Sequence, residues 1–314
     1  MPKVLVTEKI HPCGPQILTD AGYEVIYLKE PSQAELAEKI KDVDVIFTRI
    51  LDIPPDMLKT ASKLKMISKH GVGMDNIPLE ACKEHGITVT MTPDANGLSV
   101  AEFAFSLMIT LAKKIIPVSS GYKTEGFDAR NSVGSCVELT GKTLGVVGYG
   151  RIGSRVAKMA KGGLDMRVLV YDPYPAAQVS SDYERVEKLE ELFSQSDFIT
   201  LHLPLIPSTH HLINANALNL MKPTAYLINC ARGPIIDESA LIEALKSGRL
   251  AGAGLDVSDP EPASPDSPLF SLPNVILTPH YAPYSLESAI AVSKMAAENI
   301  IAFFEGSEII GKVV

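Results

Sequence analysis

The stretch Leu144–Gly153 reads LGVVGYGRIG, and it decides the fold. An apolar run leads directly into Gly148, Gly150 and Gly153, in G-x-G-x-x-G spacing, and a helical pattern, SRVAKMAK, follows. In such a strand–turn–helix unit the glycines permit a tight turn, close backbone approach to a pyrophosphate, and close packing of helix on strand. The helix N-terminus then presents N–H groups and a partial positive charge to the phosphates. We therefore expect a dinucleotide-binding Rossmann unit, with a purely structural glycine turn as the alternative.

An acidic residue at the end of the next apolar run supports the first interpretation. Asp172 stands in LVYDP, beyond the predicted helix. A carboxylate at this place accepts hydrogen bonds from the ribose hydroxyls and repels the 2′-phosphate of NADP. The sequence therefore predicts NAD as the cofactor.

Strand and helix patterns alternate on both sides of the glycine loop. Before it, β-branched runs such as Val45–Thr48 alternate with helical patterns such as Gln33–Lys41, and after it the series ends in a long helical pattern, Ser285–Glu305. This alternation is typical of βαβ units and parallel sheets. At 314 residues the chain is longer than one core usually serves. We expect an α/β protein of two doubly wound parallel-sheet domains, with residues 119–141 as a loop that leads into the second.

Composition excludes several classes of function. The net charge of −8, without a Lys/Arg cluster, argues against a nucleic-acid partner. The most apolar stretch, Val100–Ala112, contains Glu102 and is too short to cross a membrane. The four cysteines form no CxxC pair, and no signal sequence precedes the first predicted strand. We expect a cytoplasmic protein without a metal, a membrane partner or disulfides.

Three polar residues follow three successive strands of the second series: Arg232, Glu261 and His280. Doubly wound sheets bind ligands beyond the carboxyl ends of their strands. An arginine can clamp a carboxylate, and a histidine can exchange a hydroxyl proton near neutral pH, which suits 2-hydroxy-acid chemistry. The pattern leaves open whether Arg232 and Glu261 are merely loop charges. It also leaves open whether His280 or His202 is the acid–base group.

Seven stretches resemble the D-isomer-specific 2-hydroxyacid dehydrogenases. They are KHGVGMDNI (69–77), SVAEFAFSLMI (99–109), GVVGYGRIG (145–153), LHLPLIPSTHHLI (201–213), NCARGPIIDESAL (229–241), AGAGLDVSDPEP (251–262) and NVILTPH (274–280). The resemblance implies a flavodoxin-like substrate domain of residues 1–97 and 286–314. An NAD-binding Rossmann domain, residues 98–285, is inserted between them, and the cleft lies at the junction. It also implies a homodimer formed through the NAD-binding domain, to which helix 99–109 contributes.

The resemblance implies a catalytic set of Arg232, Glu261 and His280. Arg232 holds the substrate carboxylate and polarises the C2 oxygen, Glu261 orients the imidazole, and His280 takes up or returns the hydroxyl proton. Hydride moves between C2 and the nicotinamide, and His202 lines the pocket. The implied cofactor contacts are Gly148, Gly150, Arg151, Ile152, Gly153, Asp172, Leu203, Pro204, Cys230, Ala231 and Asp256. The backbone amides of Val72 and Gly73 meet the substrate carboxylate.

One departure from the family pattern follows the histidine. The family has a small apolar–glycine turn there, whereas this chain has Tyr281-Ala282-Pro283. The shape of the loop on the nicotinamide side, and its backbone contacts, are therefore in doubt.

Within the family, KHGVGMDNI and TPDANGLSVAE are most similar to phosphoglycerate dehydrogenases, which serve serine biosynthesis. Arg49 and Lys69 are the cations that could meet a distal phosphate, and surface charges are the alternative. Because the chain ends at Val314, we expect none of the regulatory domain of the longer phosphoglycerate enzymes. The alternatives are a glyoxylate/hydroxypyruvate reductase and an NAD-sensing protein similar to corepressors, and the intact catalytic set argues against the second.

Overall fold

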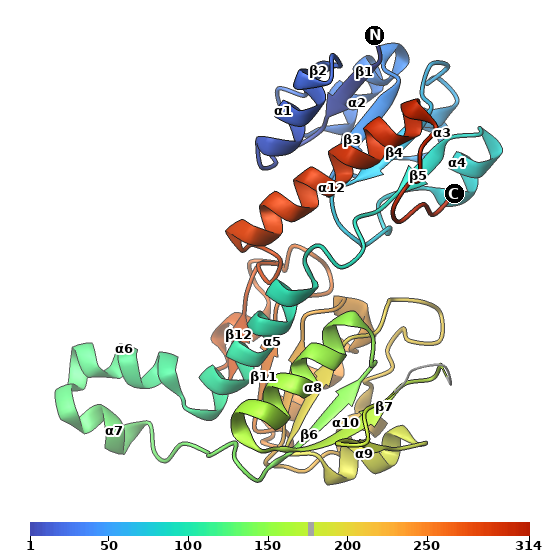
Figure 1. Cartoon of the computed structure of the whole chain (residues 1–314). Coiled ribbons are helices and arrows are strands. Elements are labelled where there is room, and N and C mark those ends of the chain that lie inside the picture. The colour runs from blue at the N-terminus through green and yellow to red at the C-terminus, as the bar shows by residue number, and fades with distance from the viewer. Residues whose placement is uncertain (175–178) are drawn as a thin grey trace. The chain divides into compact units, whose positions relative to one another are not determined.

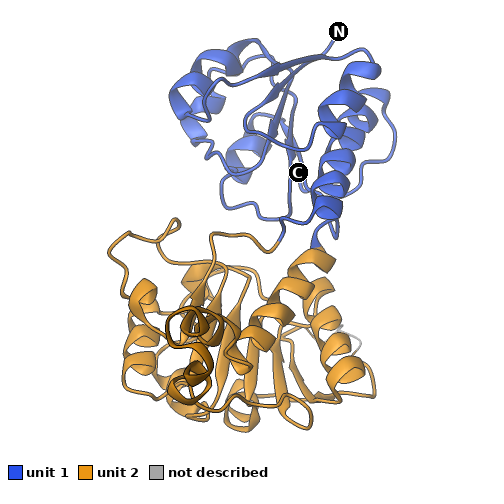
Figure 2. Cartoon of the chain, turned by 90° about the vertical axis from the view of Figure 1, so that its left-hand side faces the viewer, with its two compact units in different colours: residues 1–96, 283–314 blue, residues 97–282 orange. Residues whose placement is uncertain are grey.

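The computed structural model describes residues 1–174 and 179–314, which form two compact units (Figure 1). Unit 1 comprises residues 1–96 and 283–314, and unit 2 comprises residues 97–282 (Figure 2). Each unit is built on its own parallel β-sheet. The expected fold class, two doubly wound α/β domains with one inserted into the other, is confirmed.

Unit 1 contains a five-stranded sheet in the order β2-β1-β3-β4-β5. Its strands are β1 (Lys3–Val6), β2 (Glu24–Tyr27), β3 (Val45–Thr48), β4 (Met66–Lys69) and β5 (Thr88–Thr90). Its helices are α1 (Cys13–Asp20), α2 (Gln33–Lys39), α3 (Pro55–Leu58), α4 (Leu79–Glu84), α12 (Leu286–Glu305) and the short η1 (Ile40–Asp42). This strand order is that of flavodoxin, in which ligands bind where the order reverses, next to the first strand.

The C-terminal segment completes the core of unit 1. Helix α12 packs beside α1 and against β4, and Ala296 and Ile300 lie in one apolar cluster with Phe47. The buried hydroxyl of Ser68 donates to the carbonyl of Ala296 over 2.9 Å, which fixes the helix on the sheet. Unit 1 therefore needs both ends of the chain to exclude water from one face of its sheet.

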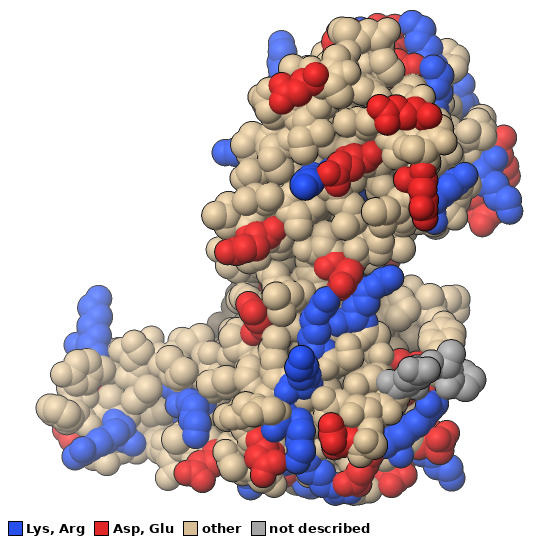
Figure 3. Space-filling model, in the orientation of Figure 1, with Lys and Arg blue, Asp and Glu red and all other residues tan. Residues whose placement is uncertain are grey.

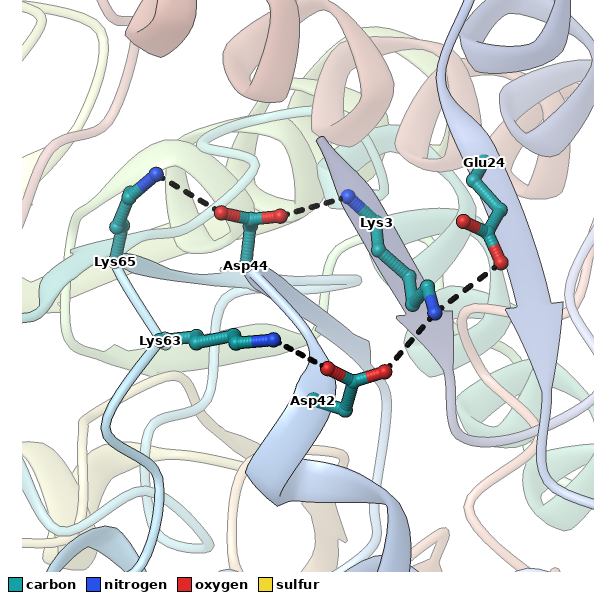
Figure 4. A network of polar contacts seen from close by, with 6 residues as sticks. All are labelled: Lys3, Glu24, Asp42, Asp44, Lys63 and Lys65. Carbon is teal, nitrogen blue, oxygen red and sulfur yellow. Dashed lines mark hydrogen bonds and ion pairs between the residues drawn. The ribbon is translucent and has the colours of Figure 1, made fainter. Parts of the chain in front are cut away.

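A polar network borders the amino-terminal ends of these strands. It consists of six side chains: Lys3, Glu24, Asp42, Asp44, Lys63 and Lys65 (Figure 4). Hydrogen bonds from Lys63 and Lys3 hold the pKa of Asp42 below its ordinary value. Because exposed pairs of this kind contribute little individually, the network serves mainly to tie neighbouring strands together. It lies at the opposite end of the sheet from the loops described below.

Unit 2 contains a seven-stranded sheet in the order β12-β11-β10-β9-β6-β7-β8. Its strands are β6 (Thr143–Val147), β7 (Arg167–Tyr171), β8 (Glu184–Arg185), β9 (Phe198–Leu201), β10 (Tyr226–Asn229), β11 (Gly252–Leu255) and β12 (Val275–Leu277). Apart from the segment 115–132, its helices are α5 (Gly97–Ala112), α8 (Arg151–Leu164), α9 (Leu189–Gln195), α10 (Ala215–Leu220) and α11 (Glu238–Lys246), with the short η3 (Gly233–Ile235) and η4 (Pro268–Ser271). Separate apolar clusters cover the two faces of the sheet, which is why its inner strands are predominantly apolar.

The expected loop at residues 119–141 is wrong in part. The chain forms helix α6 (Ile115–Glu125), the short η2 (Gly126–Asp128) and helix α7 (Ala129–Ser132), which extend away from the sheet of unit 2 (Figure 1). Helix α6 buries none of its residues. Without a buried face it has no apolar stripe at helical spacing, so the sequence pattern gave no helix signal.

None of the helices in the described part of the chain has the length and apolar character needed to span a bilayer. The cytoplasmic location expected from the sequence stays a prediction.

Candidate active site

The glycine loop has the shape that a pyrophosphate requires. Gly148 has a φ of 92°, and a Cβ at that position would lie 2.7 Å from the carbonyl oxygen of His202. A Cβ on Gly153 would lie 2.0 Å from the carbonyl oxygen of Gly148, so only glycine allows α8 to pack this closely on β6. Gly150, the N-cap of α8, borders open space and has no side chain to occupy the first-turn amides. The loop therefore fits the phosphates of a dinucleotide.

Helix α8 adds positive charge behind this loop. It carries Arg151, Arg155, Lys158 and Lys161, and basic side chains gather over it on the face shown in Figure 3. Arg151 and Ile152, two of the expected cofactor residues, form its first turn. At the N-terminus of the helix the partial positive charge of the dipole and the charge of Arg151 both favour an anionic ligand, whereas Lys161, in the last turn, is paired with Asp165.

Asp172 lies at the carboxyl edge beside the loop. The register places Val147 next to Tyr171, so Asp172 follows β7 where Gly148 follows β6. The carboxylate accepts the backbone N–H of Tyr149 over 2.7 Å and that of Tyr174 over 2.8 Å. Since a carboxylate can accept about four hydrogen bonds, it retains capacity for two ribose hydroxyls.

His202 follows β9 at the same edge, between β6 and β10. Its Nε2 lies 2.9 Å from the Thr200 hydroxyl, and burial lowers its pKa to about 3. Burial therefore disfavours the protonated form of His202, which makes this residue poorly suited to donate a proton near neutral pH. Leu203, the next residue, is buried in the core, and Pro204 is exposed.

The other histidine is paired with a carboxylate. Nδ1 of His280 lies 2.6 Å from Oε1 of Glu261, and the two side chains are 41% and 39% exposed. His280 follows β12, and Glu261 belongs to the loop after the neighbouring strand β11. A carboxylate on Nδ1 fixes the tautomer and orientation of the ring and leaves Nε2 for proton exchange. Two of the three expected catalytic residues therefore meet in the structure.

The turn that carries His280 is held by Asp256. His280 has a φ of 52°, in the left-handed region that non-glycine residues adopt only when their surroundings impose it. The Asp256 carboxylate accepts the Thr278 hydroxyl (2.6 Å) and the backbone N–H groups of Tyr281 (2.7 Å) and Ala282 (2.8 Å). The side chain is 1% exposed, and burial raises its pKa above the ordinary value. Asp256 thus positions the His280 turn, and its expected contact with the nicotinamide amide stays a prediction.

Arg232, the third expected catalytic residue, follows β10, next to β11. The amide of Asn229 holds its loop by donating to the Arg232 carbonyl and accepting from the Ala231 N–H, each over 2.9 Å. The Arg232 side chain is half-buried and donates to the Ala231 carbonyl over 2.7 Å. Cys230 beside it is half-buried, and desolvation raises the pKa of its thiol well above the ordinary value. Arg232, Glu261 and His280 hence stand at the carboxyl ends of three adjacent strands.

The expected substrate residues of unit 1 have different surroundings. Val72 and Gly73 lie in the loop after β4, next to Gly71 with its φ of 139°. Lys69, 6% exposed, does not present its ammonium group to solvent as a phosphate ligand would. It donates to the Arg49 carbonyl and to the Asn76 side chain. Arg49 itself contacts Tyr284.

Sequence reasoning missed three residues that hold this part of unit 1: Glu8, Asn76 and Tyr284. Glu8 had a usable signal, because it follows β1 at a carboxyl end just as Arg49 follows β3. Tyr284 had none, since its partner lies far away in the sequence.

Residues 105–282 match the family model described as the D-isomer specific 2-hydroxyacid dehydrogenase, NAD binding domain. The chain belongs to this family. As a member it is an enzyme of the NAD(P)-dependent 2-hydroxyacid dehydrogenase class, and the family resemblance of the sequence is confirmed.

Its relatives in this family have more than one substrate. The chain is 44% identical to the D-3-phosphoglycerate dehydrogenase of Methanocaldococcus jannaschii, over 96% of this chain and 57% of that protein. It is 39% identical to the glyoxylate reductase of Pyrococcus furiosus, over 97% of this chain and 93% of that protein. Among solved structures, it is similar to an NADPH-dependent glyoxylate/hydroxypyruvate reductase from Sinorhizobium meliloti, with 29% identity and a TM-score of 0.88 over 100% of this chain and 98% of that chain. The chain therefore spans little more than half of its phosphoglycerate relative.

Proposed function

We propose that this enzyme transfers hydride between NAD and C2 of a D-2-hydroxy acid, with 3-phosphoglycerate and 3-phosphohydroxypyruvate as its substrate pair, and that it serves serine biosynthesis. The observation that carries the proposal is the His280–Glu261 hydrogen bond on a turn fixed by Asp256. The same pair argues against an NAD-sensing binding protein, which needs no acid–base group.

Each residue of the set has one task in this reaction. The Arg232 guanidinium binds the substrate carboxylate and polarises the C2 oxygen. When bound, NADH supplies the hydride that C2 accepts. Nε2 of His280 donates the proton that converts the C2 oxygen to a hydroxyl, and takes it back in oxidation. The Glu261 carboxylate stabilises the imidazolium form and holds the ring in place.

The choice of substrate depends on Arg49. The similarity to the phosphoglycerate dehydrogenase from M. jannaschii is an argument for a phosphorylated substrate. The similarity to the glyoxylate reductases is an argument for a smaller 2-oxo acid, so glyoxylate or hydroxypyruvate reduction is the second candidate. Because Lys69 is directed at the Arg49 carbonyl, we assign the distal phosphate to Arg49 and give Lys69 a supporting role. The carboxylate contacts of Val72 and Gly73 remain part of the proposal.

We expect Arg49→Ala to lower kcat/KM for 3-phosphohydroxypyruvate by about tenfold to a hundredfold, because the loss of one charge-assisted hydrogen bond to phosphate weakens binding by about this factor. Hydroxypyruvate, which lacks the phosphate, should lose little. Steady-state kinetics with NADH on both substrates measures the difference. Equal losses on the two substrates would favour the hydroxypyruvate or glyoxylate alternative.

The proposed cofactor is NAD, on the strength of Asp172. Its carboxylate is fixed beside the glycine loop, where it would repel a 2′-phosphate. We expect Asp172→Ala to raise the ratio of kcat/KM for NADPH to that for NADH by about tenfold or more, because the mutation removes both the ribose acceptor and the repelling charge. Asp182→Ala, which removes an exposed acid elsewhere in unit 2, is the control. An unchanged ratio in Asp172→Ala would remove this residue from cofactor selection.

We also propose that the enzyme is a homodimer formed through unit 2. Helices α6 and α7 and the segment around them expose Ile115, Ile116, Tyr122 and Phe127, the last of them 74% exposed. Apolar side chains gathered on a projecting segment indicate a protein interface.

Sedimentation equilibrium should give twice the chain mass of 33.8 kDa. Phe127→Asp should shift the protein toward monomer, whereas Phe270→Asp, at an exposed phenylalanine of η4, should leave the dimer intact. A parent protein that sediments as a monomer contradicts the proposal.

A further inference from the structure

The Arg49 side chain is held by an aromatic residue from the far end of the chain. Its Nη1 donates to the Tyr284 hydroxyl over 2.6 Å, and its Cζ lies 4.5 Å from the centroid of the same ring. Tyr284 is 51% exposed, so this pair lies at the surface of unit 1. A guanidinium stacks well on an aromatic face because it is planar and weakly hydrated.

The backbone beneath Arg49 is fixed independently of that contact. The Glu8 carboxylate accepts three successive N–H groups, from Arg49 (2.8 Å), Ile50 (2.6 Å) and Leu51 (2.5 Å). On the carbonyl side, Lys69 donates to Arg49, and the Asn76 amide donates to Leu51 over 2.8 Å. Because hydrogen bonds hold the Arg49 backbone on both sides, only the rotamer of its side chain remains to be fixed.

The contact with Tyr284 fixes the rotamer of the Arg49 side chain. The position of Tyr284 in the sequence relates this contact to the proposed acid–base residue. It follows His280 by four residues, so chain connectivity keeps the two Cα atoms within roughly 14 Å of each other. It also directly follows Tyr281-Ala282-Pro283, a turn whose first two backbone N–H groups donate to the Asp256 carboxylate. The chain therefore carries the aromatic partner of Arg49 only four residues after the proposed acid–base residue.

We propose that Tyr284 is a specificity-determining residue that orients Arg49 toward the distal anionic group of the substrate. This inference rests on the proposed function of Arg49. Tyr284 uses one of the five N–H donors that a guanidinium has, and the fixed plane directs the others as a fork that fits phosphate oxygens. An arginine already held in one rotamer loses less side-chain entropy when the substrate binds, and this favours the phosphorylated acid over the unphosphorylated one.

The test compares Tyr284→Phe, Tyr284→Ala, Arg49→Ala and the double variant Arg49→Ala/Tyr284→Phe. We expect Tyr284→Phe, which keeps the ring but removes the acceptor, to raise KM for 3-phosphohydroxypyruvate about fivefold, with kcat unchanged and KM for hydroxypyruvate unchanged. Tyr284→Ala should raise KM for 3-phosphohydroxypyruvate about tenfold or more, because the contact between the guanidinium and the ring is also lost. The double variant should be no worse than Arg49→Ala alone, since the hydroxyl acts only through the guanidinium.

The matched control is Tyr27→Phe, which removes the hydroxyl of an exposed tyrosine on β2 of the same unit and should change neither KM. Equal effects of Tyr284→Phe on both substrates, or losses that add to those of Arg49→Ala, would overturn the inference. If Arg49→Ala is selective and Tyr284→Phe is not, the inference fails while the proposed substrate stands. If Arg49→Ala itself is unselective, the proposed substrate fails, and the inference fails with it.

Discussion

The hydrogen bonds of the Asp256 carboxylate fix the backbone on which the acid–base residue depends. His280 sits in a left-handed conformation that costs free energy in any residue with a Cβ, and it persists only where its neighbours impose it. The buried Asp256 carboxylate accepts the backbone N–H groups of the two residues after His280, and it also accepts the hydroxyl of Thr278, which precedes His280. Without these bonds the turn would relax, and the imidazole would lose its place beside Glu261.

The same arrangement occurs at three places among the residues that the structure describes. Asp256 follows β11 and holds the loop of its neighbour β12, Asp172 follows β7 and holds the loop after β6, and Glu8 follows β1 and holds the loop after β3. In each case a carboxylate at the end of one parallel strand accepts at least one backbone N–H from the loop of the adjacent strand. Loops normally vary in conformation, so this anchoring explains how strand-end loops can present a histidine, a phosphate-binding turn and an arginine with defined geometry.

Much of this was available from the sequence, for physical reasons. Buried parallel strands are continuous apolar runs, so runs such as Arg167–Tyr171 and Phe198–Leu201 could be located without a structure, and the glycine spacing predicted the loop at Gly148–Gly153. Helix α6 could not be predicted, because it has no buried face that would leave a periodic pattern. The role of Lys69 could not be predicted from the sequence either. Its charge was visible in the sequence, but its partners, the Arg49 carbonyl and Asn76, are set by how three loops fold together.

The central claim is that His280, oriented by Glu261, exchanges the proton at C2. The most direct measurement is the rate of 2-oxo-acid reduction by NADH for the parent, His280→Asn and Glu261→Gln, together with the Kd of NADH for each protein. The account predicts that His280→Asn lowers kcat by about 10²–10⁴-fold and that Glu261→Gln causes a smaller loss of about tenfold to a hundredfold, with Kd for NADH unchanged in both. A His280→Asn enzyme that turns over within a few-fold of the parent would contradict it.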